Sequence, residues 1–323
     1  MESFEELKKE FPGMEENVLL KSYTTFRIGG PAKYFLKTSD KDELKAVIKS
    51  ALKNGIKFMV IGGGSNTLFS SDGFDGLVVV YKIDNVKERV LVQEIKEGLF
   101  KVDATIPLSL LIMQMKNCSG LEWGVGIPGT LGGAINGNAG AMSASISDSI
   151  ESVEVLEIKD SEISERTLSK EECGFGYRTS IFKNNHNLLV VSAQLKLSKA
   201  EGNEVEERIK ANIDKRIKKQ PKGFSAGSVF KNYSGKIDES IIENYPQLKI
   251  FNDKENIPAG LLIELCGLKG KNIGDAKISE EHANFIINFG NATSDDVMSL
   301  INFIKKTVKG KFLVDLEEEI KIF

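Results

Sequence analysis

Two glycine-rich segments contain the residues of this chain that are best suited to bind a phosphorylated ligand. Seven of the seventeen residues from Gly124 to Gly140 are glycine, and the others are mostly small or apolar, unlike the Ser, Lys and Glu of a surface linker. A second run, GGGSN at Gly62–Asn66, follows a short apolar stretch typical of a strand. Consecutive backbone N–H groups without neighbouring side chains bind phosphate oxygens well. Both segments therefore indicate a phosphate cradle, although the shorter run alone is equally typical of a tight turn.

Two familiar motifs match by letter but lack the structural context that their chemistry requires. Gly124–Gly129 reads GxGxxG, yet residues 116–123 before it form a poor strand, and Pro128 disfavours the long helix of a Rossmann unit. Gly223–Gly227 reads GxSxG, yet a charged stretch precedes it where a serine hydrolase needs a buried strand. Neither a Rossmann site nor a serine hydrolase is predicted, and the chain contains no GxxxxGKS/T phosphate loop.

Composition and charge exclude several classes of protein. The 323 residues suffice for two or three domains, and a net charge of −3 does not favour a general nucleic-acid or membrane partner. The N-terminal residues lack an apolar signal core, and no run approaches the roughly 18 apolar residues of a membrane span, so we expect a cytoplasmic protein. Cys118, Cys173 and Cys266 are scattered, as reduced structural thiols are. The two histidines, His186 and His282, are far apart, and no metal site is predicted.

Helices and strands are interspersed along the chain in a pattern typical of an α+β protein. Residues 39–54 read as a helix with Ser39 and Asp42 as its capping box, and Gly55 ends it. A helix over 295–309 carries an apolar stripe that we expect in the core, made of Val297, Leu300, Ile301, Ile304 and Val308. Further helices are predicted over 108–116, 204–220 and 261–266, and strands over 57–61, 76–81, 90–95, 99–104, 152–159, 188–197 and 312–320.

A cluster of basic residues ends the helix predicted over 204–220. Residues 215–222 read KRIKKQPK. Such a run usually marks a solvated helix face. Its position directly before Gly223–Ser228 keeps anion binding open as the alternative.

Eight short motifs, in unbroken order from Thr24 to the C-terminus, resemble the UDP-N-acetylenolpyruvoylglucosamine reductases, also called UDP-N-acetylmuramate dehydrogenases. Any one motif is weak evidence, but eight in order with sensible spacing are specific. They are TTFRIGGPA at 24–32, GGGSNTL at 62–68, GIPGTLGGA at 126–134, YRTSIF at 177–182, AGSVFKN at 226–232, LKG at 268–270, HANF at 282–285 and LEEEI at 316–320.

The resemblance implies an α+β fold in three domains. Two FAD-binding subdomains of the vanillyl-alcohol-oxidase type, at 1–97 and 98–214, would precede a UDP-sugar-binding domain at 215–323, and the C-terminal strand is a candidate addition to the first subdomain. It also implies noncovalent FAD that is reduced by NADPH and then reduces an enolpyruvyl ether to a lactyl ether. The product, UDP-N-acetylmuramate, would serve peptidoglycan synthesis and hence cell shape and division. We expect a monomer whose partner is this UDP-sugar, with no nucleic acid and no membrane.

The resemblance assigns roles to individual residues. Arg178 would grip the substrate carboxylate, Glu319 as a neutral acid would polarise it, and Ser228 would donate a proton to the α-carbon. Without the resemblance, the three glutamates at 317–319 are typical of an exposed edge. The expected substrate contacts are Tyr177, Lys219, Asn232 and His282, although a lone histidine is more often structural. The expected FAD contacts are Gly62, Gly63, Gly64, Ser65, Asn66, Gly126, Ile127, Pro128, Gly129, Gly132, Gly133, Asn138 and Gly140.

Two departures from the family pattern accompany the resemblance. One family type has an insertion with a tyrosine that closes over the UDP-sugar, whereas residues 198–220 here contain no tyrosine, so the chain resembles the shorter type. Tyr233 stands where the family usually has proline. The main alternative is a flavin-dependent oxidase on the same scaffold, but those enzymes often attach flavin through His or Cys, which neither glycine segment contains. A flavin- or nucleotide-binding module without turnover leaves Arg178, Ser228 and Glu319 unexplained as a set.

Overall fold

The computed structural model describes residues 4–85, 90–200 and 202–323 and divides the chain into two compact units. The first unit consists of Met1–Val18, Ala32–Gly63 and Asp75–Lys218. The second consists of Leu19–Pro31, Gly64–Phe74 and Lys219–Phe323. The chain therefore passes from one unit to the other within the run GGGSN.

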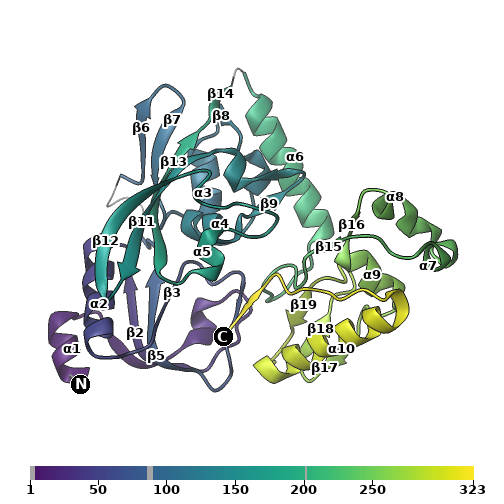
Figure 1. Ribbon diagram of the computed structural model, residues 1–323, viewed down its shortest axis with the longest axis horizontal. Helices are drawn as coiled ribbons and strands as arrows, with labels where there is room; N and C mark the ends of the chain where they lie inside the picture. The colour runs from purple at the N-terminus through teal and green to yellow at the C-terminus, as the bar shows by residue number, and fades with distance from the viewer. Residues whose placement is uncertain (1–3, 86–89, 201) are drawn as a thin grey trace. The chain divides into compact units, whose positions relative to one another are not determined.

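A four-stranded sheet with two helices forms one half of the first unit. Its strand order is β1 (Glu15–Leu19), β2 (Pro31–Thr38), β5 (Phe74–Tyr81) and β3 (Phe58–Ile61), and β3 runs parallel to β5. Figure 1 shows α1 (Phe4–Glu10) and α2 (Lys41–Lys53) in purple next to this sheet. Their apolar residues, including Leu7, Leu44 and Ile48, form a buried cluster with Leu77 and Val79 of β5. The strands predicted at 57–61 and 76–81 are confirmed.

The predicted capping box of α2 is wrong. Asp40 is the N-cap, because its Oδ1 accepts hydrogen bonds from the backbone N–H groups of Asp42 (2.8 Å) and Glu43 (2.9 Å). A carboxylate that accepts two N–H groups satisfies the open end of the helix without Ser39. The stop is as predicted: α2 ends at Lys53, and Gly55 has φ +65°.

A five-stranded antiparallel sheet forms the other half of the first unit. Its order is β12 (Glu162–Ser169), β11 (Ile150–Lys159), β13 (Leu188–Lys196), β7 (Leu99–Asp103) and β6 (Val92–Lys96). β12 has no clear signal in the sequence, because its residues are mostly polar and exposed. A second buried cluster joins this sheet to the short helices α3 (Leu108–Gln114), α4 (Leu131–Gly137) and α5 (Ile181–Asn184).

The long basic helix predicted over 204–220 is confirmed as α6 (Glu204–Lys219). It follows β14 (Ser198–Lys199), which pairs with β8 (Cys118–Ser119), as Figure 1 shows. Val205 and Ile209 anchor α6 in the second buried cluster. The described part of 198–220 forms this short strand and this helix.

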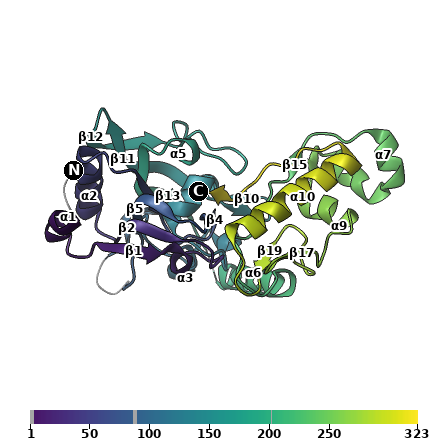
Figure 2. The same ribbon diagram turned by 90° about the horizontal axis from the view of Figure 1, so that it is seen from below.

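The second unit is built around α10 (Ser294–Phe312). In Figure 2 this yellow helix lies beside β17 (Asn272–Ile273) and β19 (Ile286–Asn288). These two strands flank β18 (Ala276–Ile278) in a three-stranded sheet. The predicted apolar stripe of α10 is fully buried and packs with α9 (Ala259–Leu265).

The remaining elements are short. Those of the second unit are α7 (Glu239–Asn244), α8 (Lys249–Asn252), β15 (Tyr233–Ser234) and β16 (Asn256–Ile257). Those of the first unit are β9 (Gly140–Ala141) and β10 (Ala144–Ser145).

The strand predicted over 312–320 is wrong. Phe312 is 1% exposed and continues the buried face of α10, so the helix ends there and Leu313, with φ +58°, caps it. The chain that follows is extended but makes one isolated bridge, between Glu318 and Phe230. The regular terminal strand is β20 (Lys321–Ile322), which pairs in parallel with β4 (Thr67–Leu68).

The domain boundaries proposed at 97/98 and 214/215 stay a prediction. The structure has two compact units, and the first of them contains two separate buried clusters. Among the helices of the described residues, none has the length and apolar content needed to cross a membrane.

Candidate active site

The glycine segment forms a loop, a short helix and a turn. Gly126 and Gly129 have φ of +77° and +116°, which favour glycine, and Ile127 and Pro128 lie between them. Thr130 caps α4, because its Oγ1 accepts the Gly133 N–H at 3.3 Å. Gly132 and Gly133 lie in the first turn of α4, Asn138 (φ +44°) caps its end, and Gly140 begins β9.

The two predicted phosphate-binding segments meet in the first unit. A Cβ atom added at Gly62 would overlap Thr130 Oγ1, and one added at Gly63 would lie 2.8 Å from Gly129 Cα. A side chain at Gly62 would therefore displace the Thr130 side chain, and one at Gly63 would require a shift of the Gly129 backbone. This close approach of bare backbone from two loops fits a bound diphosphate group.

The rest of the run GGGSN belongs to the second unit and is tied to the motif that begins at Thr24. Thr25 N donates to Gly64 O (3.2 Å), and Thr25 Oγ1 donates to Ser225 O (2.7 Å). Asn66 Nδ2 donates to Glu319 O at 3.1 Å. Segments that are far apart in sequence, and that the resemblance singled out, are therefore in direct contact within this unit.

Arg178 is fixed to the end of the glycine segment. It has φ +55° in a tight turn whose ends, Gly176 and Thr179, bond each other. Its Nη2 donates to Gly140 O at 2.6 Å, and Asn138 Nδ2 donates to Gly176 O at 2.8 Å. The guanidinium lies 5.4 Å from the ring centroid of Tyr177, whose side chain is exposed. The first unit thus presents Arg178 and Tyr177 beside the predicted FAD-binding segment.

Two residues that the sequence analysis missed strengthen this attachment. Ser180 Oγ donates to Asn136 O at 2.7 Å, and Asn136 Nδ2 donates to Phe182 O at 3.0 Å. Together with Asn138, Asn136 binds the segment that carries Arg178. The sequence signal was the pair of asparagines in NGN, whose side chains bond backbone readily.

Ser228 and Glu319 lie close together in the second unit. Ser228 bridges to Phe285, and Glu319 N donates to Val229 O at 2.7 Å. The backbone of Glu319 therefore lies beside the residue that follows Ser228. Glu317 pairs with Lys231, and Glu318 pairs with Lys305 at 2.7 Å. The three glutamates are thus not a simple exposed edge, because Glu318 is only 25% exposed.

Asn284 holds the Ser228 segment in place, and the sequence analysis did not single it out. Its Oδ1 accepts the Phe230 N–H at 3.0 Å, and its Nδ2 donates to Phe230 O at 2.8 Å. Its own backbone O accepts the Val229 N–H at 2.8 Å. A 4% exposed amide with these bonds is a specific clamp on the extended chain. Its position within HANF was the available signal.

The other predicted substrate contacts also belong to the second unit. His282 Nδ1 accepts the Asn284 N–H at 3.3 Å, which leaves the proton of the neutral ring on Nε2. Burial lowers the pKa of His282, so the ring is neutral near pH 7. Asn232 Oδ1 accepts the Ala259 N–H at 3.4 Å, and Lys219 is the last residue of α6.

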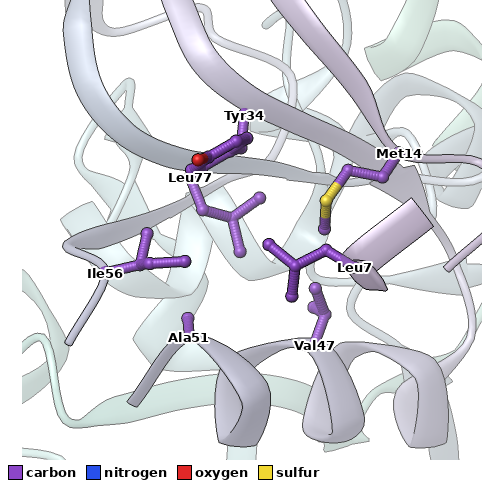
Figure 3. Close-up of a pocket in the computed structure, with 7 residues that line it drawn as sticks. All are labelled: Leu7, Met14, Tyr34, Val47, Ala51, Ile56 and Leu77. Atoms are coloured by element: carbon purple, nitrogen blue, oxygen red, sulfur yellow. The ribbon is translucent and has the colours of Figure 1, made fainter. Parts of the chain in front are cut away.

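A small pocket lies elsewhere, between α1, α2 and the four-stranded sheet. Its lining is apolar apart from the Tyr34 hydroxyl, as Figure 3 shows, and contains none of the predicted site residues. The Tyr34 hydroxyl is the one polar side-chain group of this lining, which carries no basic or acidic side chain. Among the described residues, no group of three or more His, Cys, Asp and Glu side chains is placed to hold a metal ion.

The chain is similar to known proteins over almost its whole length. Residues 218–323 match the model of the UDP-N-acetylenolpyruvoylglucosamine reductase C-terminal domain, and residues 32–165 match an FAD-binding domain. UDP-N-acetylenolpyruvoylglucosamine reductases of Chlamydia muridarum and Clostridium tetani are 39% and 38% identical to it, over 97% and 96% of this chain and 95% and 92% of theirs. The crystal structure of the Thermus caldophilus enzyme of that name superposes with a TM-score of 0.73 at 32% identity, covering 96% of this chain and 99% of that one. These matches confirm the predicted fold class.

Proposed function

Because the chain belongs to the UDP-N-acetylenolpyruvoylglucosamine reductase family, we propose that Arg178, Ser228 and Glu319 carry out the family's reaction here. The protein is an FAD-containing oxidoreductase that uses NADPH to reduce UDP-N-acetylglucosamine enolpyruvate to UDP-N-acetylmuramate, in peptidoglycan precursor synthesis. The observation that best supports the residue assignment is the hydrogen bond from Arg178 to Gly140, because it attaches the proposed carboxylate-binding residue to the proposed cofactor-binding segment.

Gly62–Asn66 and Gly126–Gly140 are the proposed FAD-binding residues. The close approach of Gly63 to the Gly129 backbone, where a Cβ would lie 2.8 Å from Gly129 Cα, supports a site built from backbone. Bound FAD supplies hydride transfer from NADPH to the substrate. The remaining chemistry falls to the protein, which must bind the substrate carboxylate, stabilise the negative charge that develops next to it, and protonate carbon.

Arg178 and Glu319 are proposed to act on the substrate carboxylate. The planar guanidinium binds a carboxylate through two donors and favours the additional negative charge of an enolate. Glu319 is proposed to act as the neutral acid, since a second anion beside the enolate would oppose its formation. The bond from Asn66 to the Glu319 carbonyl supports a fixed position for this residue.

Ser228 is proposed to donate the proton to the α-carbon. A serine hydroxyl is a weak acid, but an enolate is basic enough to take its proton. The bridge to Phe285 and the bonds from Asn284 around Val229 hold the Ser228 backbone in an extended conformation. Tyr177, Lys219, Asn232 and neutral His282 are proposed substrate contacts. We further propose a cytoplasmic monomer with the three domains 1–97, 98–214 and 215–323.

The two half-reactions test this function directly. Under anaerobic conditions, NADPH should bleach the flavin of the purified protein without sugar present, and the enolpyruvyl UDP-sugar should then restore the oxidised spectrum. Acid precipitation should release the flavin, since it is expected to be noncovalent. Rapid reoxidation by oxygen with no response to the sugar would instead favour the oxidase alternative, and a colourless protein that takes up no FAD would contradict both.

A further inference from the structure

One face of α6 binds the residues that lead into the glycine segment. Arg208, Asn212 and Arg216 are spaced four apart, so their side chains lie along one side of the helix. Asn212 Nδ2 donates to Glu122 O at 3.0 Å, and Arg216 Nη2 donates to Trp123 O at 3.0 Å. This row of side chains holds the chain just before Gly124.

Arg208, the first residue of this row, has its hydrogen-bond donors and its charge paired with Glu122. Nε and Nη2 of Arg208 both donate to Glu122 Oε1, at 3.0 and 2.8 Å, and Glu122 Oε2 accepts the Gly120 N–H at 2.7 Å. Burial raises the pKa of Glu122, but these backbone and arginine hydrogen bonds outweigh it and hold the pKa below its ordinary value. The positive charge of Arg208 is therefore fully matched.

Arg216 differs from Arg208 in lacking such a match. Its Nε is buried, and no described residue accepts a hydrogen bond from it. No carboxylate of the described residues forms an ion pair with its guanidinium, and burial, with no acidic neighbour to offset it, lowers the pKa of Arg216. A buried donor on an unmatched cation is costly in a protein interior unless an anion completes it.

The position of Arg216 indicates which anion this is. A Cβ atom added at Gly126 would lie 3.1 Å from Arg216 Cδ, so the arginine stem lies against the first turn of the loop proposed to bind FAD. We propose that Arg216 binds a diphosphate group and that this group belongs to FAD, with Nε as the donor. The inference rests on the proposed FAD site. The other source of the same chemistry is the diphosphate of the UDP-sugar, since Lys219 follows one turn later on α6.

Titration of apoprotein separates these possibilities. FAD and riboflavin are titrated into the apoproteins of wild type, Arg216→Met and Arg216→Lys, and binding is followed by flavin fluorescence. UDP is titrated into the corresponding holoenzymes, and its binding is measured by calorimetry. Loss of a charge-assisted hydrogen bond should raise the FAD Kd of Arg216→Met roughly ten- to hundredfold. Arg216→Lys, which keeps the charge, should recover part of this. The Kd values of riboflavin, which lacks a diphosphate, and of UDP should stay unchanged.

Lys215→Met is the matched control, because it removes a neighbouring exposed charge from the same helix and should leave the FAD Kd unchanged. An unchanged FAD Kd in Arg216→Met would overturn the inference, as would weaker UDP binding with normal FAD binding. Equal weakening of FAD and riboflavin would also overturn it, because that is the signature of a lost structural contact to Trp123. If Arg216→Met does not fold, Arg216→Lys provides the test. Its Kd for FAD should be raised while its Kd for riboflavin stays unchanged, and an unchanged Kd for FAD or an equal rise in both values would overturn the inference. A wild type that binds no FAD would instead contradict the proposed function itself.

Discussion

Individual residues of the candidate site are held in position in two different ways. Arg178 is held by its own side chain, through the bond to Gly140, whereas Ser228 is held by its neighbours, through the bonds of Asn284 to Val229 and Phe230. A substitution of Ser228 therefore removes a hydroxyl without removing a structural contact that the described residues depend on. This makes the residue suitable for testing chemistry separately from folding.

The first prediction concerns Ser228→Ala. Turnover should fall about 10²–10⁴-fold, the usual effect of losing a positioned proton donor. Flavin content and bleaching by NADPH should stay near wild type, and Ser228→Cys should recover part of the loss because a thiol also donates a proton. The measurement is flavin reoxidation by the enolpyruvyl sugar in a single turnover. Reoxidation of the alanine variant at the wild-type rate would assign the proton to another donor.

The second prediction concerns His282 and pH. Because burial lowers its folded pKa below the ordinary value of 6.5, the unfolded chain takes up a proton first as pH falls. Its contribution to stability is therefore complete above about pH 6.5 and is lost as pH falls below that value. Urea unfolding at pH 7.5 and 5.5 should show a larger acid-induced loss of unfolding free energy in wild type than in His282→Gln. His186→Gln, at an exposed position, should behave as wild type; equal losses in all three proteins would contradict the prediction.

Secondary-structure elements position these residues mainly through their ends. Thr130 begins α4, Asn138 ends it, and both residues also belong to the glycine segment. Asp40 begins α2 in place of the predicted Ser39. Periodic apolar residues place a helix reliably along the chain, but several polar residues near its start compete for the cap. The choice among them depends on backbone geometry.

The third prediction distinguishes these two caps. Asp40→Ala should reduce the free energy of unfolding by about 1 kcal/mol, because two N–H groups of α2 lose their acceptor. Ser39→Ala should have a smaller effect. Chemical denaturation of the two variants under one set of conditions provides the comparison, and a larger loss in Ser39→Ala would restore the capping box.

At the scale of the whole molecule, both units draw on distant parts of the sequence. The core of the second unit includes Phe26, Ile28 and Leu68 from the N-terminal region together with residues of α9 and α10. In the first unit, the loops at Gly62 and Gly129 meet although more than sixty residues separate them. The proposed cofactor site therefore depends on folding of the whole chain rather than on one local motif.

The fourth prediction tests this meeting of loops. Gly63→Ala should lower flavin occupancy, because its Cβ would lie 2.8 Å from Gly129 Cα. Gly310→Ala, in α10 and outside the proposed FAD-binding segments, is the control, because an added Cβ there has no described neighbour within 4 Å. The measurement is the ratio of flavin to protein absorbance after purification, with circular dichroism to verify folding. Normal occupancy in Gly63→Ala would mean that the cradle tolerates a side chain.

Features that depend on local pattern were determined by the sequence alone. The apolar stripe of α10 and the strand before Gly62 follow from the period of the hydrophobic residues, and the family follows from the order of eight motifs. These properties depend on residues that are close together in the sequence, so the sequence is sufficient to predict them.

Contacts between distant segments were decided only by the tertiary structure. The amide clamp of Asn284 and the bond from Arg178 to Gly140 each join residues that are far apart in sequence. The buried Nε of Arg216 likewise results from packing against the distant Gly126. The extension of α10 to Phe312 has the same origin, because burial of that ring favours helix where the apolar pattern had predicted strand. Local preferences are small, and the burial of apolar surface and polar groups outweighs them wherever the two conflict.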